Sequence, residues 1–239
     1  MIGIIIILAV SWLILYVFER RSLLALGFLP VLIRAGQFLM GFLITGLLCA
    51  GVQYMEVLIS SAEWKINIAA FPMLLEMFWW DFRSVLTEEL VFRGAILFVL
   101  IRKFGASGAL LLSAIAFGVY HWFSFGIFGN FMPMLVIFIG TGLMGYAWAL
   151  AFYKTESIIM PLGLHLGWNF FYNSIFSNGP LGEGLILTEG GQAISDWYSL
   201  IGLLLVPVIV LLIVIYWMPK VQDNSIFSDR EVSVPKIQQ

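Results

Sequence analysis

The sequence predicts an all-α fold, a polytopic bundle of about seven transmembrane helices with a range of six to eight. Of the 239 residues, 62% are hydrophobic and only 11% are charged, against about 45–50% and about 25% in ordinary soluble domains. So few charged side chains cannot cover a surface in water, and the lipid bilayer is therefore the expected surrounding partner. The formal net charge of −2 excludes the basic surface typical of nucleic-acid-binding proteins.

Each span is predicted from its length, because a transmembrane helix needs about 20 mostly apolar residues. Residues 2–18 carry no charge and form the first span, whereas residues 23–33 are apolar but too short to cross alone. The seven predicted spans are residues 2–18, 35–54, 66–101, 106–123, 131–153, 158–176 and 197–218. They form one domain over residues 1–218, and the polar tail 219–239 is expected to be disordered.

The Lys and Arg residues predict the orientation of these spans. With 66–101 counted as one crossing, only Lys65 falls on one side of the membrane. The other side carries Arg20, Arg21, Arg34, Arg102, Lys103, Lys154 and Lys220. The positive-inside rule makes this second side cytoplasmic, so we expect a multi-pass protein of the cell membrane with the N-terminus outside and the C-terminus in the cytoplasm. If residues 66–101 instead formed a broken pair of helices, they would not count as one crossing, and this assignment of sides would fail.

The predicted span 66–101 is unusual because six ionisable residues interrupt it: Glu76, Asp81, Arg83, Glu88, Glu89 and Arg93. The first three fit an amphipathic or interfacial stretch that precedes the true span. The last three lie within the apolar layer, where ionisable groups are costly and usually functional. Glu89 and Arg93 are four positions apart in the order that favours an ion pair on a helix. Glu88 points about 100° away and is left for another partner.

The two histidines of the chain are the candidates for such a partner. Glu88 and His121 lie about equally far from the turn near Gly105, so an antiparallel helix hairpin would place both about 24 Å from it, at one level. His165 and Asn169 share a face of the span 158–176, one turn apart. They would either form hydrogen bonds between helices or donate to a developing oxyanion.

Three motifs stand in order along these spans: E-E-x-x-x-R at 88–93, F-x-x-x-H at 117–121 and H-x-x-x-N at 165–169. Together they resemble the CPBP family of intramembrane proteases, which includes the CAAX prenyl endopeptidases and the bacterial Abi proteins, over roughly residues 71–173. The resemblance implies that Glu88 and His121 activate the attacking water and that His165 and Asn169 stabilise the oxyanion. Glu89 and Arg93 would support the site.

The resemblance leaves the cofactor open, because family members have been described both as metalloproteases and as metal-free glutamate proteases. Glu88, His121 and His165 would supply two histidines and one carboxylate to Zn²⁺, with a coordination position left for water. The H-E-x-x-H pattern of soluble zinc proteases is absent from the sequence. We favour the version without a metal, and no other cofactor is expected.

The predicted function is therefore an intramembrane endopeptidase that hydrolyses a peptide bond in a membrane-associated peptide or protein. A different class of function uses the same polar cavity for binding alone, as a non-catalytic bacteriocin-immunity or scaffold protein. A small proton-coupled transporter is a third hypothesis, since buried Glu, His and Arg sets also relay protons. The lack of an inverted repeat in the sequence weakens it.

Overall fold

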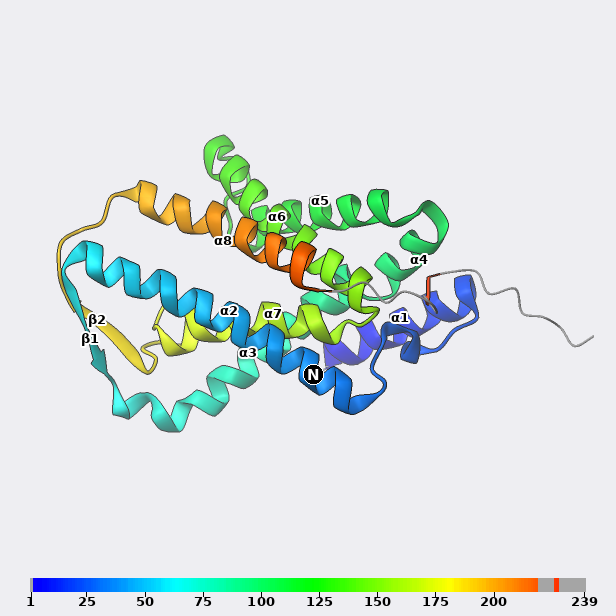
Figure 1. The fold of residues 1–239 in the computed structure, drawn as a ribbon, viewed down its shortest axis with the longest axis horizontal. Helices are drawn as coiled ribbons and strands as arrows, with labels where there is room; N and C mark the ends of the chain where they lie inside the picture. Colours follow the sequence, from blue (N-terminus) through cyan, green and yellow to red (C-terminus); the bar gives the residue numbers. More distant parts are fainter. Residues whose placement is uncertain (1, 219–225, 228–239) are drawn as a thin grey trace, which may run out of the picture.

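The computed structural model describes residues 2–218, 226 and 227, and Figure 1 shows them as a bundle of long helices. The α-helices are α1 (Ile2–Glu19), α2 (Val31–Ser60), α3 (Leu74–Phe92), α4 (Ala95–Phe104), α5 (Ala106–Ser124), α6 (Phe131–Thr155), α7 (Ile159–Phe170) and α8 (Asp196–Trp217). Short 3₁₀ turns cover Leu23–Leu26 and Ile68–Met73, and a π-helical turn, Phe171–Ile175, follows α7. The predicted all-α class is confirmed.

The apolar lengths of the helices agree with a membrane bundle. By length and composition α1, α2, α5 and α6 can each cross a membrane, and α8 contains a shorter apolar stretch, Gly202–Trp217. Apolar side chains also cover much of the outer surface: Leu47 on α2 is 67% exposed and Ile5 on α1 is 62% exposed. Such a surface is stable only against an apolar surrounding, so the structure supports a protein embedded in the bilayer.

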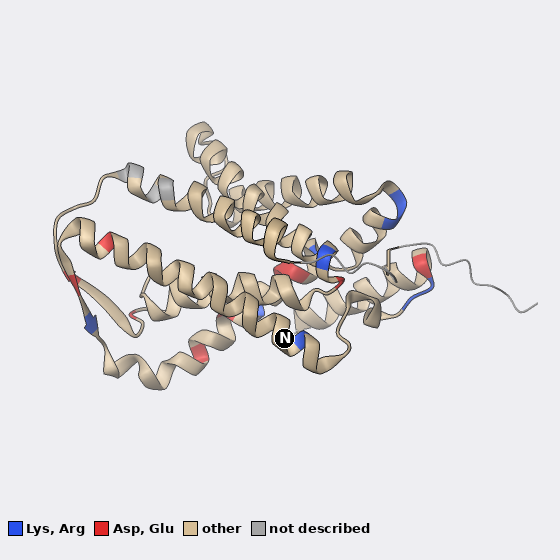
Figure 2. Ribbon diagram, viewed as in Figure 1, with Lys and Arg blue, Asp and Glu red and all other residues tan. Residues whose placement is uncertain are grey.

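The two ends of the bundle differ in charge and in structure. At one end Arg102 of α4 pairs with Glu19 of α1, and Lys154 donates from Nζ to the Val214 carbonyl oxygen at 2.9 Å. Figure 2 shows Lys and Arg positions gathered near this end, where α4 meets α5. At the other end a small sheet joins the α2–α3 connection to the segment before α8. This grouping agrees with the prediction that most Lys and Arg residues lie at the same end of the helices.

The predicted span 66–101 is divided into two helices, α3 and α4, so the broken-helix alternative describes its local structure. Gly94 has ψ −139°, which ends α3, and a Cβ atom there would overlap the carbonyl oxygen of Leu90. The break frees the Phe92 carbonyl oxygen, which accepts a hydrogen bond from Ser113 Oγ at 2.9 Å. A freed carbonyl within a membrane needs such a partner. The segment nevertheless runs from one end of the bundle to the other, because Asn67 bonds to Leu185 at the sheet end and Arg102 lies at the opposite end.

The small sheet was also not predicted. Strand β1 (Ala62–Ile66) pairs antiparallel with β2 (Ile186–Gly190), in the register Lys65↔Leu187. Lys65 Nζ lies 2.8 Å from Glu189 Oε1, and this hydrogen bond and the charge of Glu189 raise the pKa of the exposed Lys65 ammonium. The pair gives Lys65, which the predicted topology placed apart from the other Lys and Arg residues, an acidic partner at the sheet end.

Glycines allow the helices that carry the site to approach closely. A Cβ atom on Gly167 of α7 would overlap the Phe42 carbonyl oxygen of α2, and Thr45 Oγ1 donates to the Leu164 carbonyl oxygen at 2.6 Å. On α6, a Cβ atom on Gly145 would lie 2.9 Å from Phe117 of α5. Small residues commonly permit such packing in membranes. Helices α5, α6 and α7 are thereby held at the separation that the site requires.

The polar tail 219–239, which was expected to be disordered, lies outside the described residues except for Ile226 and Phe227. The Phe227 ring is 5.3 Å from the ring of Phe98 and 5.8 Å from that of Phe152. These two tail residues therefore pack against α4 and α6.

Candidate active site

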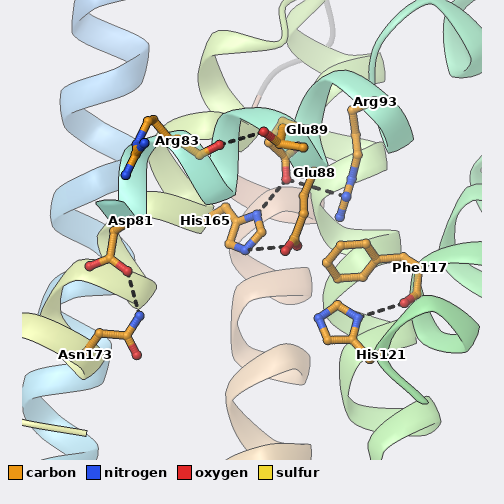
Figure 3. Close-up of polar contacts among 10 residues, drawn as sticks. Asp81, Arg83, Glu88, Glu89, Arg93, Phe117, His121, His165 and Asn173 are labelled. Atoms are coloured by element: carbon orange, nitrogen blue, oxygen red, sulfur yellow. Dashed lines mark hydrogen bonds and ion pairs between the residues drawn. The ribbon is translucent and has the colours of Figure 1, made fainter. Parts of the chain in front are cut away.

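His165 of α7 lies between the two adjacent carboxylates of α3. Its Nδ1 atom is 2.8 Å from Glu89 Oε1, and its Nε2 atom is 3.8 Å from Glu88 Oε2 (Figure 3). Because a carboxylate can only accept, Nδ1 carries the hydrogen and donates to Glu89. That leaves Nε2 facing Glu88 at a distance longer than a direct hydrogen bond. The sequence motifs placed these residues on separate helices, and only the fold brings them together.

Glu89 also forms the predicted ion pair with Arg93. Arg93 Nη1 is 3.5 Å from Glu89 Oε1, and both side chains are fully buried. The guanidinium carbon of Arg93 lies 4.1 Å from the centre of the Phe117 ring and 5.0 Å from that of Trp148. Aromatic faces attract a cation, so these rings replace part of the hydration that burial removes. Glu89 thus connects a cation and an imidazole, which leaves Glu88 less compensated.

An aromatic face also holds the imidazole of His165. The His165 ring is stacked on the Trp148 ring, with 3.9 Å between the centroids and 21° between the planes. Together with the hydrogen bond to Glu89, this contact restricts both the position and the rotation of the imidazole. A histidine oriented by a carboxylate on one nitrogen presents the other nitrogen for chemistry, as in hydrolytic triads. In this geometry His165 Nε2 is the nitrogen that is presented for chemistry, and it faces Glu88.

His121 of α5 lies nearby but contacts neither carboxylate directly among the described residues. Its Nδ1 atom is 2.8 Å from the Phe117 carbonyl oxygen, one helical turn earlier, and its ring lies 4.4 Å from the Phe117 ring. The predicted level of α3 against α5 agrees with the packing, since Phe92 contacts Phe117 and Tyr120. The bond to the backbone leaves His121 Nε2 available to a water or a substrate.

Asn169 follows His165 by one turn of α7 and is half-buried. Within the described residues its amide makes no hydrogen bond, so both its donor and its acceptor remain available. A position on the His165 face of α7 is what the H-x-x-x-N spacing predicted. The side chain could therefore donate to a group bound beside His165.

A polar cluster at Asp81 was not predicted. The sequence favoured an interfacial position for this residue, but Asp81 is 0% exposed. Its oxygens accept hydrogen bonds from Asn173 Nδ2 at 2.6 Å and from Ser174 Oγ at 3.0 Å, both in the π-helical turn after α7. The cluster ties α3 to the end of α7, and so it fixes how Glu88 and His165 face each other. The sequence feature that could have indicated this cluster is the polar pair Asn173-Ser174 within an apolar span.

A cavity of about 310 Å³ opens beside Glu88. Gly3 and Ile4 of α1 form one wall, Arg83 and Thr87 of α3 line another, and Tyr120 of α5 completes it together with Glu88. This volume lies at the lower end of the range typical of ligand sites. The cavity gives a bound molecule access to the Glu88 carboxylate from the side of α3 that faces α1.

The donor arrangement does not fit a metal centre. In the part of the chain that the structure describes, no three His, Cys, Asp or Glu side chains are grouped so that they could hold a metal ion. Glu88, His121 and His165, the set named for zinc, are not arranged as a common ligand set. The Arg93 guanidinium, 3.5 Å from Glu89, also makes this position unfavourable for a further cation.

Comparison with known protein families identifies the segment that contains all these residues. Residues 70–171 match the family described as type II CAAX prenyl endopeptidase Rce1-like. No curated protein and no solved structure matches the chain. The match confirms the resemblance to the CPBP and CAAX protease family that the three motifs indicated. At the level of the family, it supports a CAAX-type intramembrane protease.

Proposed function

We propose that this protein is an intramembrane endopeptidase that hydrolyses a peptide bond of a membrane-associated peptide or protein without a metal ion. The observation that carries the proposal is the position of Glu88. Its Oε2 atom is buried and accepts no hydrogen bond within the described residues, yet it faces His165 Nε2 and adjoins a cavity. A carboxylate in this position is suited to accept a proton from a water molecule bound beside it.

In the proposed reaction Glu88, assisted by His121, takes a proton from water while the water oxygen attacks the peptide carbonyl carbon. The carbonyl oxygen becomes an oxyanion, and His165 Nε2–H and the Asn169 amide donate to it. The C–N bond then breaks, and Glu88 passes its proton to the leaving amine. The products are a new carboxylic acid, which then releases its proton, and a new amine, so one water is consumed for each bond broken.

Glu89 and Arg93 act through His165 in this proposal. The Glu89 carboxylate orients the imidazole and stabilises its charged form while Nε2–H donates. Arg93 balances the charge of the buried Glu89 carboxylate. The 2.8 Å hydrogen bond from His165 Nδ1 to Glu89 Oε1 supports this division of roles between adjacent acids.

Comparative proteomics of cells carrying the wild-type protein or Glu88→Gln tests the proposal. We expect a membrane peptide whose cleavage product is present with the wild-type protein and absent with the variant, although both proteins are inserted in equal amounts. A Glu88→Gln variant that still forms every product would contradict the role of Glu88. The binding-only alternative predicts instead that Glu88→Gln keeps the cellular phenotype and that no product depends on the wild-type protein.

A further inference from the structure

A tyrosine side chain that the proposed reaction does not use lines the cavity beside Glu88. Tyr120 reaches this cavity from α5, whereas Glu88 reaches it from α3. Tyr120 is 38% exposed, and its hydroxyl makes no hydrogen bond within the described residues. The charge of Glu88 acts on this hydroxyl, so the two groups lie near each other. The cavity thus contains an unused hydrogen-bonding group beside the proposed base.

Neighbouring rings fix the position of the Tyr120 side chain. Its ring centre lies 5.4 Å from that of Phe92 on α3 and 5.2 Å from that of His121, which it meets edge-on at 85°. Aromatic rings favour such tilted and edge-to-face contacts at these distances. Phe92 follows Glu88 by one turn of α3, so the first contact places Tyr120 against the face of α3 that carries Glu88. The hydroxyl is therefore held at a defined place in the cavity wall.

The other hydroxyls that line the cavity are less suited to hold a molecule beside Glu88. Thr87 Oγ1 already donates to the Arg83 carbonyl oxygen at 2.8 Å. Ser84 precedes Glu88 by one turn of the same helix, so a water held by both would lie against the surface of α3. Of the polar residues that line the cavity, Tyr120 is the one that comes from another helix. Its hydroxyl can therefore hold a water in the space between α3 and α5.

We propose that Tyr120 is a further catalytic residue, whose hydroxyl holds the attacking water together with Glu88. This inference rests on the proposed endopeptidase function, since it adds a second contact to the same water. The water donates one hydrogen to the Glu88 carboxylate and the other to Tyr120 Oη, so a lone pair of the water oxygen is left to face the peptide carbonyl carbon. When Glu88 takes its proton, the water oxygen bonds to that carbon. Tyr120 neither gains nor loses a proton in this step.

Tyr120→Phe removes the hydroxyl and keeps the ring contacts. Its kinetics are measured in phosphatidylcholine nanodiscs on the peptide whose cleavage depends on Glu88. We expect kcat to fall by about 10- to 100-fold with KM unchanged, because the water is oriented less well while the peptide is bound as before. Tyr216→Phe is the matched control, since it removes an exposed hydroxyl from α8 and should change neither constant. An unchanged kcat would overturn the proposal. A raised KM with an unchanged kcat would also overturn it and assign Tyr120 to peptide binding.

The water itself can be observed without turnover. Crystals of the wild-type protein and of Tyr120→Phe are grown in a lipidic mesophase and measured at a resolution that shows ordered water. We expect a water within hydrogen-bond distance of both Glu88 and Tyr120 Oη in the wild-type protein, and its loss or displacement in the variant. A wild-type cavity without this water overturns the proposal even where Glu88→Gln abolishes cleavage. A wild-type protein that holds the water but forms no Glu88-dependent product contradicts the endopeptidase function instead.

Discussion

Glu89 of α3 accepts a hydrogen bond from His165 of α7, with 2.8 Å between His165 Nδ1 and Glu89 Oε1, although the two residues are 76 positions apart in the chain. The same Glu89 oxygen lies 3.5 Å from Arg93, so one buried carboxylate interacts with both an imidazole and a guanidinium. This arrangement leaves the neighbouring Glu88 as the carboxylate beside the cavity.

Glu89→Gln should lower the cleavage rate by about 10²- to 10⁴-fold, because an amide orients His165 but does not stabilise its charged form. The rate is measured on the peptide identified by proteomics. Glu63→Gln, which changes an exposed glutamate of β1, is the control and should retain the wild-type rate. A Glu89→Gln protein with full activity would show that the carboxylate has no part in the reaction.

Arg93→Met should destabilise the fold by about 3–5 kcal/mol, because it leaves the Glu89 charge buried without its partner. Thermal unfolding in detergent micelles measures this loss. The double variant Glu89→Gln with Arg93→Met should lose less than the sum of the two single changes, since neither charge is then left alone. Strictly additive losses would contradict a direct pairing of the two side chains.

Arg93→Lys separates the charge of Arg93 from its planar shape. Lysine keeps the positive charge but cannot lie flat against the Phe117 and Trp148 rings. We expect a smaller destabilisation than for Arg93→Met, of about 1–2 kcal/mol. If Arg93→Lys unfolds as readily as Arg93→Met, the aromatic contacts matter more than the charge.

Chelators should leave the cleavage rate unchanged if the reaction proceeds without a metal. The purified protein is treated with EDTA and with 1,10-phenanthroline, and its metal content is measured by mass spectrometry. We expect no metal in proportion to the protein. Loss of activity with a chelator and recovery on addition of Zn²⁺ would contradict the metal-free proposal.

The orientation in the membrane is testable with single cysteines, because Cys49 is the only native one and is buried. In a Cys49→Ser background, Lys65→Cys should react with a membrane-impermeant maleimide in intact cells, whereas Lys103→Cys should react only after lysis. This result follows from a cytoplasmic position of the Lys/Arg-rich end. The reverse labelling pattern would invert the proposed topology.

Local sequence patterns predicted several features well because short-range physics controls them. Hydropathy predicted α1, α2, α5 and α6, since a bilayer demands long apolar helices. The helical period predicted the Glu89–Arg93 pair, which lies within one turn. The same period did not reveal the break at Gly94, because the bond from Ser113 that satisfies the freed Phe92 carbonyl comes from another helix.

Packing of the helices also determines that Glu88 and His165 lie at the same level in the bundle. Glu88 lies farther along the chain from the α4–α5 turn than His165 lies from the α6–α7 turn, yet their side chains approach to 3.8 Å. Figure 1 shows the reason: the α4–α5 corner extends beyond the α6–α7 turn, so the longer path along α4 does not separate the two residues.

The sequence by itself determined that this chain is a helical membrane protein, which residues carry charge within the apolar layer and which family the segment with the motifs resembles. Each of these depends on composition, on spacing within one helix or on the order of short motifs. Only the tertiary structure decided that His165 lies between Glu88 and Glu89, that Asp81 is buried against Asn173 and that Arg83 shares the cavity of Glu88. Those contacts join different helices or depend on the walls between them, and their geometry follows from how closely the helices pack.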